Sequence, residues 1–231
     1  MTKVRLDDPP CTVQVLRNKR ARRFTLRLDP GGNGAILTIP VTARETAWRG
    51  FLDQHTGWLR KALARQPDRV AVTDGAEVPV GGVLHRVDVV EGPRRAARQD
   101  GGRLILSGAG AEGTRIAAFL RLRARDLIEP AARAYARRVG RRVERIALRD
   151  TRSRWGSCST TGTLSFSWRL AMAPDAVLDY VAAHEAAHLV EMNHSPRYWR
   201  VVDGLVPDWK THRDWLKTHG RGLHVFDFAG G

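Results

Sequence analysis

The stretch VAAHEAAHLVEMNHSPRYW, residues 181–199, contains three of the eight histidines of the chain. His184 and His188 are four residues apart, which on a helix places both imidazoles on one face, one turn apart, within reach of a single ion. Zn²⁺ prefers nitrogen ligands in tetrahedral geometry. Glu185 lies beside them, where its carboxylate can take a proton from a metal-bound water. The spacing H-E-x-x-H therefore predicts a zinc site with Glu185 as the catalytic base.

A catalytic zinc needs three protein ligands and one open position. His194 follows His188 by six residues, and a continuous helix would carry it about 240° away from the other two histidines. His194 is therefore a ligand only if the helix ends before it. Asn193 and the pair Ser195-Pro196 provide signals for such an end, so we predict that His184, His188 and His194 bind the metal.

Glu191 is a rival third ligand. The three-histidine spacing matches that of metzincins, in which a glycine makes the turn three residues after the second histidine; here Glu191 occupies that position. On a continuous helix Glu191 shares a face with His184 and His188, so it is either a ligand or an acceptor that sets a histidine tautomer. The spacing is also compatible with a third ligand from a more distant part of the chain, and with histidines that are purely structural.

The residues before the metal motif predict a β-rich region followed by helices. Apolar residues alternate with polar ones, or recur at helical spacing, between strong turn signals. The expected elements of residues 1–110 are strands within 11–41, a turn at 30–34, a helix at 43–65 that starts with a capping box at Thr42, a linker at 66–76, a hairpin over 78–90 and a strand at 104–106.

The apolar period becomes helical from Thr114. The expected elements of residues 111–231 are a helix to about 140 with a kink at Pro130, strands at 154–159 and 163–168, a helix opened by Pro174 with the metal motif near its middle, a short helix capped by Ser195, and a last helix over 207–219. We therefore expect an α+β protein with a domain boundary at 110/111.

Composition limits the class of protein further. The 231 residues are 42% hydrophobic and 27% charged, as in globular proteins with a core. The N-terminus lacks the apolar run of a signal peptide, and no apolar stretch is long enough to span a membrane, so we expect a cytoplasmic protein without membrane contact. The two cysteines, Cys11 and Cys158, are too few for a disulfide scaffold. We interpret Cys158 as a small buried residue; a nucleophilic thiol is the alternative.

The net charge of +15 indicates attraction to polyanions. Basic runs at 17–23 and 133–145 favour non-specific contact with nucleic acid, whereas a solvated helix face is the simpler explanation of the second run. No Gly-rich phosphate loop is present. The charge therefore supports a polyanionic partner without identifying it.

Several longer motifs carry a resemblance to a known family. The segments HEAAHLVEMNHSPRYW, RSRWGSCS (152–159), WRLAMAP (168–174) and PDWKTHRDWLKTHG (207–220) resemble the YgjP-type metallopeptidases, which are related to the SprT-like and WLM zinc peptidases. The resemblance is strongest over 149–220 and extends more weakly to the basic stretch RNKRARR at 17–23. Its one departure is modest, because Ala186 and Ala187 fill positions where larger residues are common.

The resemblance implies a zincin-like catalytic domain, in which a small sheet packs against the helix that carries the metal ligands. It implies zinc on His184, His188 and His194, Glu185 as the base, and a strand at 155–159 near the cleft whose free edge holds an extended peptide. The family is also linked to hydrolysis of UTP, and SprT-like relatives act on proteins attached to DNA. A polypeptide and a nucleoside triphosphate are therefore both candidate substrates.

Hydrolysis of an amide also needs a donor for the developing oxyanion besides the metal. Tyr198, Arg154 and His212 are the candidates, and each has an alternative role in packing or at the surface. Trp155 flanks the motif as a candidate wall of the cleft, with core packing as the alternative.

Overall fold

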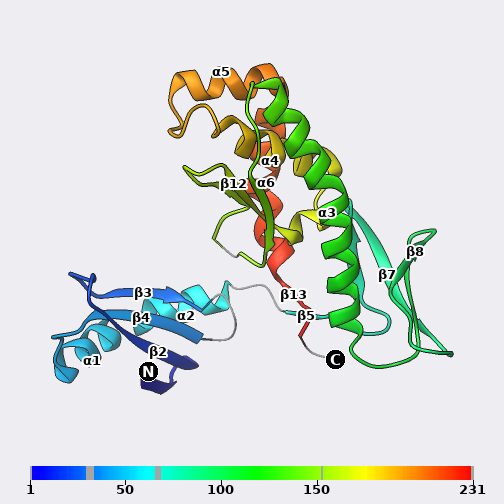
Figure 1. Cartoon of the computed structure of the whole chain (residues 1–231). Coiled ribbons are helices and arrows are strands. Elements are labelled where there is room, and N and C mark those ends of the chain that lie inside the picture. The colour runs from blue at the N-terminus through cyan, green and yellow to red at the C-terminus, as the bar shows by residue number, and fades with distance from the viewer. Residues whose placement is uncertain (1, 30–33, 66–68, 152, 230–231) are drawn as a thin grey trace. The chain divides into compact units, whose positions relative to one another are not determined.

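The computed structural model describes residues 2–29, 34–65, 69–151 and 153–229. The chain forms two compact units, Met1–Asp68 and Arg69–Gly231 (Figure 1). Both combine sheets with helices, in agreement with the expected α+β class. The boundary expected at 110/111 lies inside the second unit, because the sheet before it and the helix after it share one hydrophobic core.

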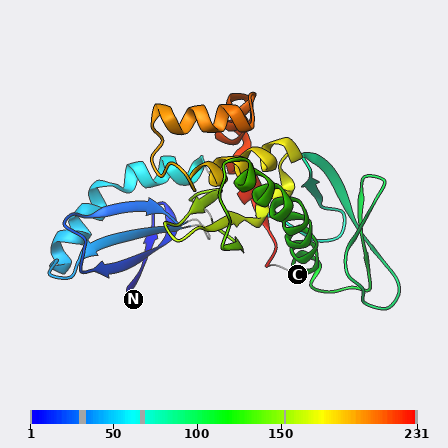
Figure 2. The same cartoon turned by 45° about the horizontal axis from the view of Figure 1, so that its top comes forward.

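The first unit is a four-stranded sheet covered by two helices on one face (Figure 2). The strand order is β1-β2-β4-β3, with β2 and β4 parallel and the other pairs antiparallel. The core lies between sheet and helices and includes Val13, Leu37 and Trp48. The elements are β1 (Thr2–Asp7), β2 (Pro10–Asn18), β3 (Thr25–Leu28), β4 (Gly34–Pro40), α1 (Glu45–Gln54) and α2 (Thr56–Ala64).

Two predictions for this unit were wrong. The helix expected over 43–65 is broken at His55, whose ring Nδ1 bonds the Phe51 carbonyl at 2.7 Å and so competes with the regular helical pattern. The capping box at Thr42 does not form, since the N-cap of α1 is Arg44, without a side-chain hydrogen bond.

Strand β1 was not expected; its Val4 and Leu6 pack on the core at period two. Most of the turn expected at 30–34 lies outside the described residues.

The second unit begins with another four-stranded sheet, ordered β6-β7-β9-β8. The predicted hairpin is confirmed: Gly81 and Gly82 join its strands with φ values of 60° and 83°, a left-handed pair that side chains with a Cβ rarely adopt. The expected linker at 66–76 contains the short β5, which pairs with β13 near the C-terminus. The elements are β5 (Val70–Ala71), β6 (Glu77–Val80), β7 (Val83–Val90), β8 (Arg98–Asp100), β9 (Arg103–Ser107) and β13 (Phe226–Asp227).

Helix α3 (Glu112–Arg138) runs along the second unit and carries Pro130 inside it, close to the predicted bounds (Figure 1). Its buried stripe, which includes Ile116, Leu120 and Ile128, packs on the 3₁₀ segment η1 (Trp168–Met172) and on α4 (Asp175–Ala187). The metal motif therefore rests on the main core of this unit.

A three-stranded sheet ordered β10-β12-β11 lies beside α4. Strand β10 (Arg145–Arg149) is parallel to β12 (Thr163–Ser167), and β11 (Gly156–Cys158) is antiparallel to it. Among the described residues β11 pairs with β12 alone, so its other edge is free, as the resemblance implied. Strand β10 was not predicted, because the arginines at both of its ends make the alternation of apolar and polar residues hard to recognise.

Three short elements complete the unit: α5 (Pro196–Leu205), α6 (Trp209–His219) and the 3₁₀ segment η2 (Gly220–His224). The predicted short helix and last helix are thus confirmed. Within the described ranges, none of the helices is both long and apolar enough to cross a bilayer.

Candidate metal centre

The metal motif lies at the C-terminal end of α4, not near its middle as expected. The helix ends at Ala187, so His184 lies in its last turn and His188 is the C-cap. Tight bonds from Leu189 N to Ala186 O and from Val190 N to Ala187 O close the end. The turn needs no glycine at Glu191, because Ala111 is the only non-glycine with positive φ among the described residues.

The early end of α4 brings His194 back to the other two histidines. One ring nitrogen from each of His184, His188 and His194 lies within 4.8 Å of the others. The Nε2 atoms of His184 and His194 are 3.2 Å apart, and nitrogens around a tetrahedral zinc with bonds of ~2.1 Å lie roughly 3.4 Å apart. Ser195 caps α5 by accepting a bond from Tyr198 N at 3.3 Å, which holds His194 just before the helix.

Hydrogen bonds orient two of the three rings. His188 Nδ1 donates to the Glu191 carbonyl at 3.1 Å, and His184 Nδ1 lies 3.4 Å from the Tyr180 hydroxyl. Each contact directs the ring's Nε2 toward the cluster. Burial, with the neighbouring imidazoles, lowers the pKa of His184 to about 3, and burial lowers the pKa of His188. The neutral form is the one that binds metal, so the three residues fit a zinc ion.

Glu191 contributes to this arrangement through its backbone. Its carboxylate faces Arg197 at 3.7 Å and is absent from the cluster of ligand atoms within the described chain. Its carbonyl accepts the bond from His188 Nδ1. The geometry therefore favours a Glu191 that orients a histidine, through its carbonyl, over a Glu191 that binds the metal.

Glu185 is buried beside the histidines and accepts no hydrogen bond from any described residue. Burial raises the pKa of its carboxyl to about 8, against the opposing charge of Arg154. Strand β11 lies directly against the carboxylate: a Cβ placed on Gly156 would come within 2.4 Å of Glu185 Oε1. Glycine at position 156 is therefore required for this close approach.

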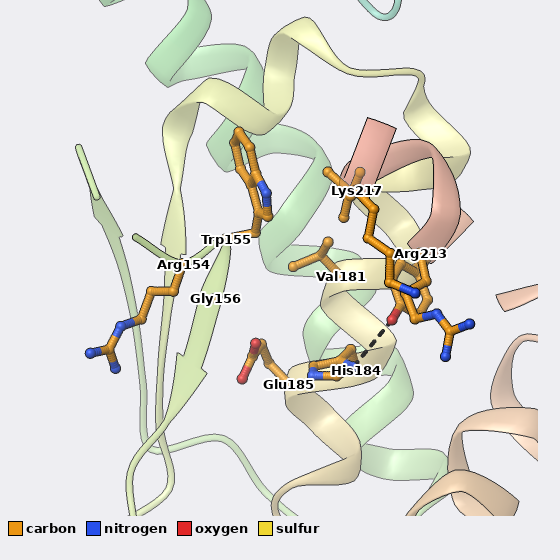
Figure 3. Close-up of a pocket in the computed structure, with 10 residues that line it drawn as sticks. Arg154, Trp155, Gly156, Val181, His184, Glu185, Arg213 and Lys217 are labelled. Atoms are coloured by element: carbon orange, nitrogen blue, oxygen red, sulfur yellow. Dashed lines mark hydrogen bonds between the residues drawn. The ribbon is translucent and has the colours of Figure 1, made fainter. Parts of the chain in front are cut away.

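A cavity of about 370 Å³, here called the metal cavity, opens beside Glu185 and His184. Figure 3 shows its walls: the Arg154–Gly156 segment faces Val181, His184 and Glu185 of α4, and α6 contributes Arg213 and Lys217. Apolar side chains, the Glu185 carboxylate and the His184 imidazole thus line a space large enough for part of a substrate.

A model of the YgjP-like metallopeptidase domain matches residues 22–219. The chain belongs to the YgjP-like metallopeptidase family. A search of curated proteins found no match. The resemblance seen in the sequence is thereby confirmed, and the family together with the three-histidine cluster indicates a metal-dependent hydrolase.

The four residues predicted as possible substrate or oxyanion contacts lie in different places in this YgjP-like domain. Trp155 and Arg154 line the metal cavity, although the Arg154 guanidinium points away from Glu185 (Figure 3). The Tyr198 hydroxyl donates to the His184 backbone carbonyl at 3.0 Å, and its ring stacks on His188 at 4.5 Å. His212 is paired with Asp208 at 3.0 Å. Neither Tyr198 nor His212 lines the cavity, and Tyr198 supports the site by its contacts with His184 and His188.

Sequence reasoning missed four residues of this YgjP-like site. Tyr180 precedes His184 by one helical turn, and that spacing could have identified it. Gly156 was quoted only as part of a motif. Arg213 and Lys217 enter the cavity from α6, and no local pattern relates α6 to α4. Contacts between elements distant in sequence had to be seen in the structure.

Cys158 lies on β11 near Glu185. Burial, with a smaller contribution from the charge of Glu185, raises the pKa of its thiol to about 11. A raised pKa disfavours the thiolate that a nucleophile requires. Both Cys11 and Cys158 are free thiols, and the structure supports the interpretation of Cys158 as a small packed residue.

Proposed function

We propose that this protein is a zinc-dependent peptidase in which Glu185 is the general base. The observation that carries the proposal is the position of Glu185: its carboxylate is buried beside the three-histidine cluster, lies against the edge strand β11 and opens into the metal cavity. His184, His188 and His194 would hold the ion. When bound, zinc would lower the pKa of a coordinated water toward ~7 and polarise the substrate carbonyl.

The chain's own residues supply the proton transfers and the positioning. Glu185 accepts the proton of the attacking water and delivers it to the leaving amine. Its unpaired carboxylate in a buried site suits this task, because no competing hydrogen bond has to break first. Tyr180 and the Glu191 carbonyl keep the rings of His184 and His188 in their binding orientation.

The substrate is expected to lie extended beside β11. The free edge of this strand offers backbone N–H and C=O groups that pair with another extended backbone. Trp155 and Val181 line the adjacent part of the cavity. A peptide held this way would present a carbonyl to the space between Glu185 and the histidines.

The test compares wild-type protein with Glu185→Gln, each loaded with one equivalent of zinc. We expect the wild type to cleave unstructured polypeptides, detected by mass spectrometry, and the variant to bind zinc equally without cleaving. Full turnover by zinc-loaded Glu185→Gln would contradict the mechanism. Pyrophosphate release from UTP, lost in the same variant, would assign the site to nucleotide hydrolysis instead.

A further inference from the structure

Two cavities lie at the two ends of strand β11. The metal cavity touches its start at Gly156. A second cavity of about 320 Å³, here called the strand-end cavity, is lined by Ser159–Gly162 just after the strand and by the ligand His188. The two are separated by three residues of extended chain, or ~10 Å. A segment laid along β11 would therefore pass from one cavity to the other across the metal site.

A third cavity of about 430 Å³, here called the arginine cavity, adjoins the strand-end cavity. The two share Arg141, Arg142 and Glu144 in their linings. The arginine cavity also includes Arg133 and Arg137 from the last turns of α3. A groove with a strongly basic far end thus leads away from His188.

The arginines of this groove outnumber their carboxylate partners. Arg133 is paired with Glu129, and Arg141 Nε donates to the Leu189 carbonyl at 3.3 Å, which fixes it beside the end of α4. Arg137 and Arg142 are exposed and make no ion pair with any described residue. Both guanidinium groups are therefore available to a ligand.

The metal cavity, at the other end of β11, is also lined by basic side chains. Arg213 and Lys217 lie one turn apart on α6 and share a single carboxylate, Asp214, at 3.2 and 3.1 Å. The Arg213 guanidinium packs over the ring of Trp209 at 4.8 Å, which limits its motion. One carboxylate between two cations leaves positive charge at the rim of the metal cavity.

From this arrangement we propose that the substrate is an acidic polypeptide segment, bound along β11 with its acidic side chains held by Arg137 and Arg142 at one end and by Arg213 and Lys217 at the other. The inference rests on the proposed peptidase function and adds the class of substrate. Ordering a flexible chain costs entropy, and charge pairs at both ends help to offset that cost and select the chain that is bound.

Polypeptide fits this groove better than nucleic acid. The free edge of β11 recognises a peptide backbone, which a polynucleotide lacks. Apart from the imidazole of His188, none of the described residues lining the strand-end or arginine cavity carries an aromatic ring, whereas binding of single-stranded nucleic acid relies on aromatic side chains on which bases stack. Guanidinium groups pair with side-chain carboxylates in the same bidentate way as with phosphates, so the arginines are compatible with an acidic peptide.

The experiment measures binding with zinc-loaded Glu185→Gln, which is expected not to consume the probe. Three fluorescein-labelled peptides of equal length share an apolar centre and differ only in flanks of Glu, Gln or Lys. By fluorescence anisotropy we expect the Glu-flanked peptide to bind about tenfold more tightly than the Gln-flanked one, with the difference lost at high salt.

Removal of Arg137 and Arg142 isolates the groove from the overall charge of the protein. We expect Arg137→Gln/Arg142→Gln, in the Glu185→Gln background, to weaken binding of the Glu-flanked peptide about fivefold and to leave the Gln-flanked peptide unchanged. Arg125→Gln, an exposed arginine on α3 that lines none of the three cavities, is the matched control and should change neither. Equal unfolding temperatures establish that all variants are folded.

Cleavage of the same peptides by zinc-loaded wild type separates the two proposals. Preferential cleavage of the Glu-flanked peptide supports both. Equal binding and cleavage of the three peptides would overturn the acidic substrate and leave the peptidase standing. No cleavage of any peptide would contradict the peptidase function, and with it the substrate class. An oligonucleotide of equal charge that binds more tightly than the Glu-flanked peptide, and loses this in Arg137→Gln/Arg142→Gln, would overturn the inference in favour of nucleic acid.

Discussion

Two charged side chains are buried to the same extent in the second unit, Arg169 in η1 and Glu185 in α4, each 4% exposed. The Arg169 guanidinium bonds Asp150 at 2.7 Å and the carbonyls of Leu223 and Phe226 at 3.1 and 3.2 Å. Glu185 accepts no hydrogen bond from any described residue. A buried charge with partners ties segments together, whereas one without partners is costly and points to a function.

The comparison extends to the two units. Among the described residues of Met1–Asp68, none of the buried side chains is charged, and the core is apolar. All buried charged residues of the described chain lie in the second unit, which also holds the three-histidine cluster. The chemistry of this protein is therefore concentrated in Arg69–Gly231.

The largest expected effect comes from removing the unpaired charge. Glu185→Gln should lower kcat by about 10³-fold, because a general base of this kind contributes 10² to 10⁴. Stability of the zinc-free protein should not fall, since burial raises the pKa of the Glu185 carboxyl to about 8 and the substitution replaces a largely neutral group by an amide of the same shape. Kinetics and urea unfolding measure the two quantities. A marked loss of stability with little loss of kcat would assign Glu185 a structural role.

Substitution of Arg169, the buried charge that has partners, should lower stability and leave kcat nearly unchanged. Arg169→Met keeps an unbranched, flexible apolar stem but leaves the Leu223 and Phe226 carbonyls without their donor. We expect the free energy of unfolding to fall by about 3 kcal/mol, with Asp150 still hydrated at the surface. The kcat of folded, zinc-loaded protein should change less than about threefold. An unchanged urea midpoint would show that the Arg169 bonds contribute nothing to stability.

Gly156→Ala tests whether the position of Glu185, and not only its presence, matters. The new Cβ would lie 2.4 Å from Oε1 and 2.5 Å from Cγ of Glu185, so the whole Glu185 side chain must shift. Displacement of a catalytic group by about 1 Å costs up to 10²-fold, and we expect kcat to fall about 30-fold with zinc content unchanged. Gly204→Ala on α5, where a Cβ meets nothing within 4 Å, is the control. Equal kcat in both variants would contradict the close approach.

The smallest expected effect is that of Tyr198→Phe, which tests whether the Tyr198 hydroxyl only supports the His184 backbone or takes part in catalysis. Tyr198→Phe removes one buried hydrogen bond to the His184 carbonyl, which should cost about 1 kcal/mol of stability. The ring and its stacking on His188 are retained, so kcat should fall less than about threefold. A loss of 10² or more at constant zinc content would restore Tyr198 as a donor to the oxyanion.

Local pattern was sufficient wherever the governing interaction is local. Three local features were predicted correctly: the H-E-x-x-H spacing on a helix, the N-cap at Ser195 and the hairpin turn at Gly81-Gly82. Each depends on residues within one or two turns of chain. The predicted return of His194 to the cluster is consistent with the geometry. The end of α4 was misplaced, since two alanines favour continuation of a helix and give no sign of its end.

Taken by itself, the sequence determined the protein's family, its α+β class and the three histidines with their neighbouring glutamate. Tertiary structure alone decided that Gly156 meets Glu185, that α6 brings Arg213 and Lys217 to the metal cavity, and that Tyr198 faces a backbone carbonyl. It also decided that the buried Arg169 has hydrogen-bond partners and that the buried Glu185 has none among the described residues. These features depend on how segments distant in sequence pack together, and no local periodicity encodes which side chain a distant segment will contact.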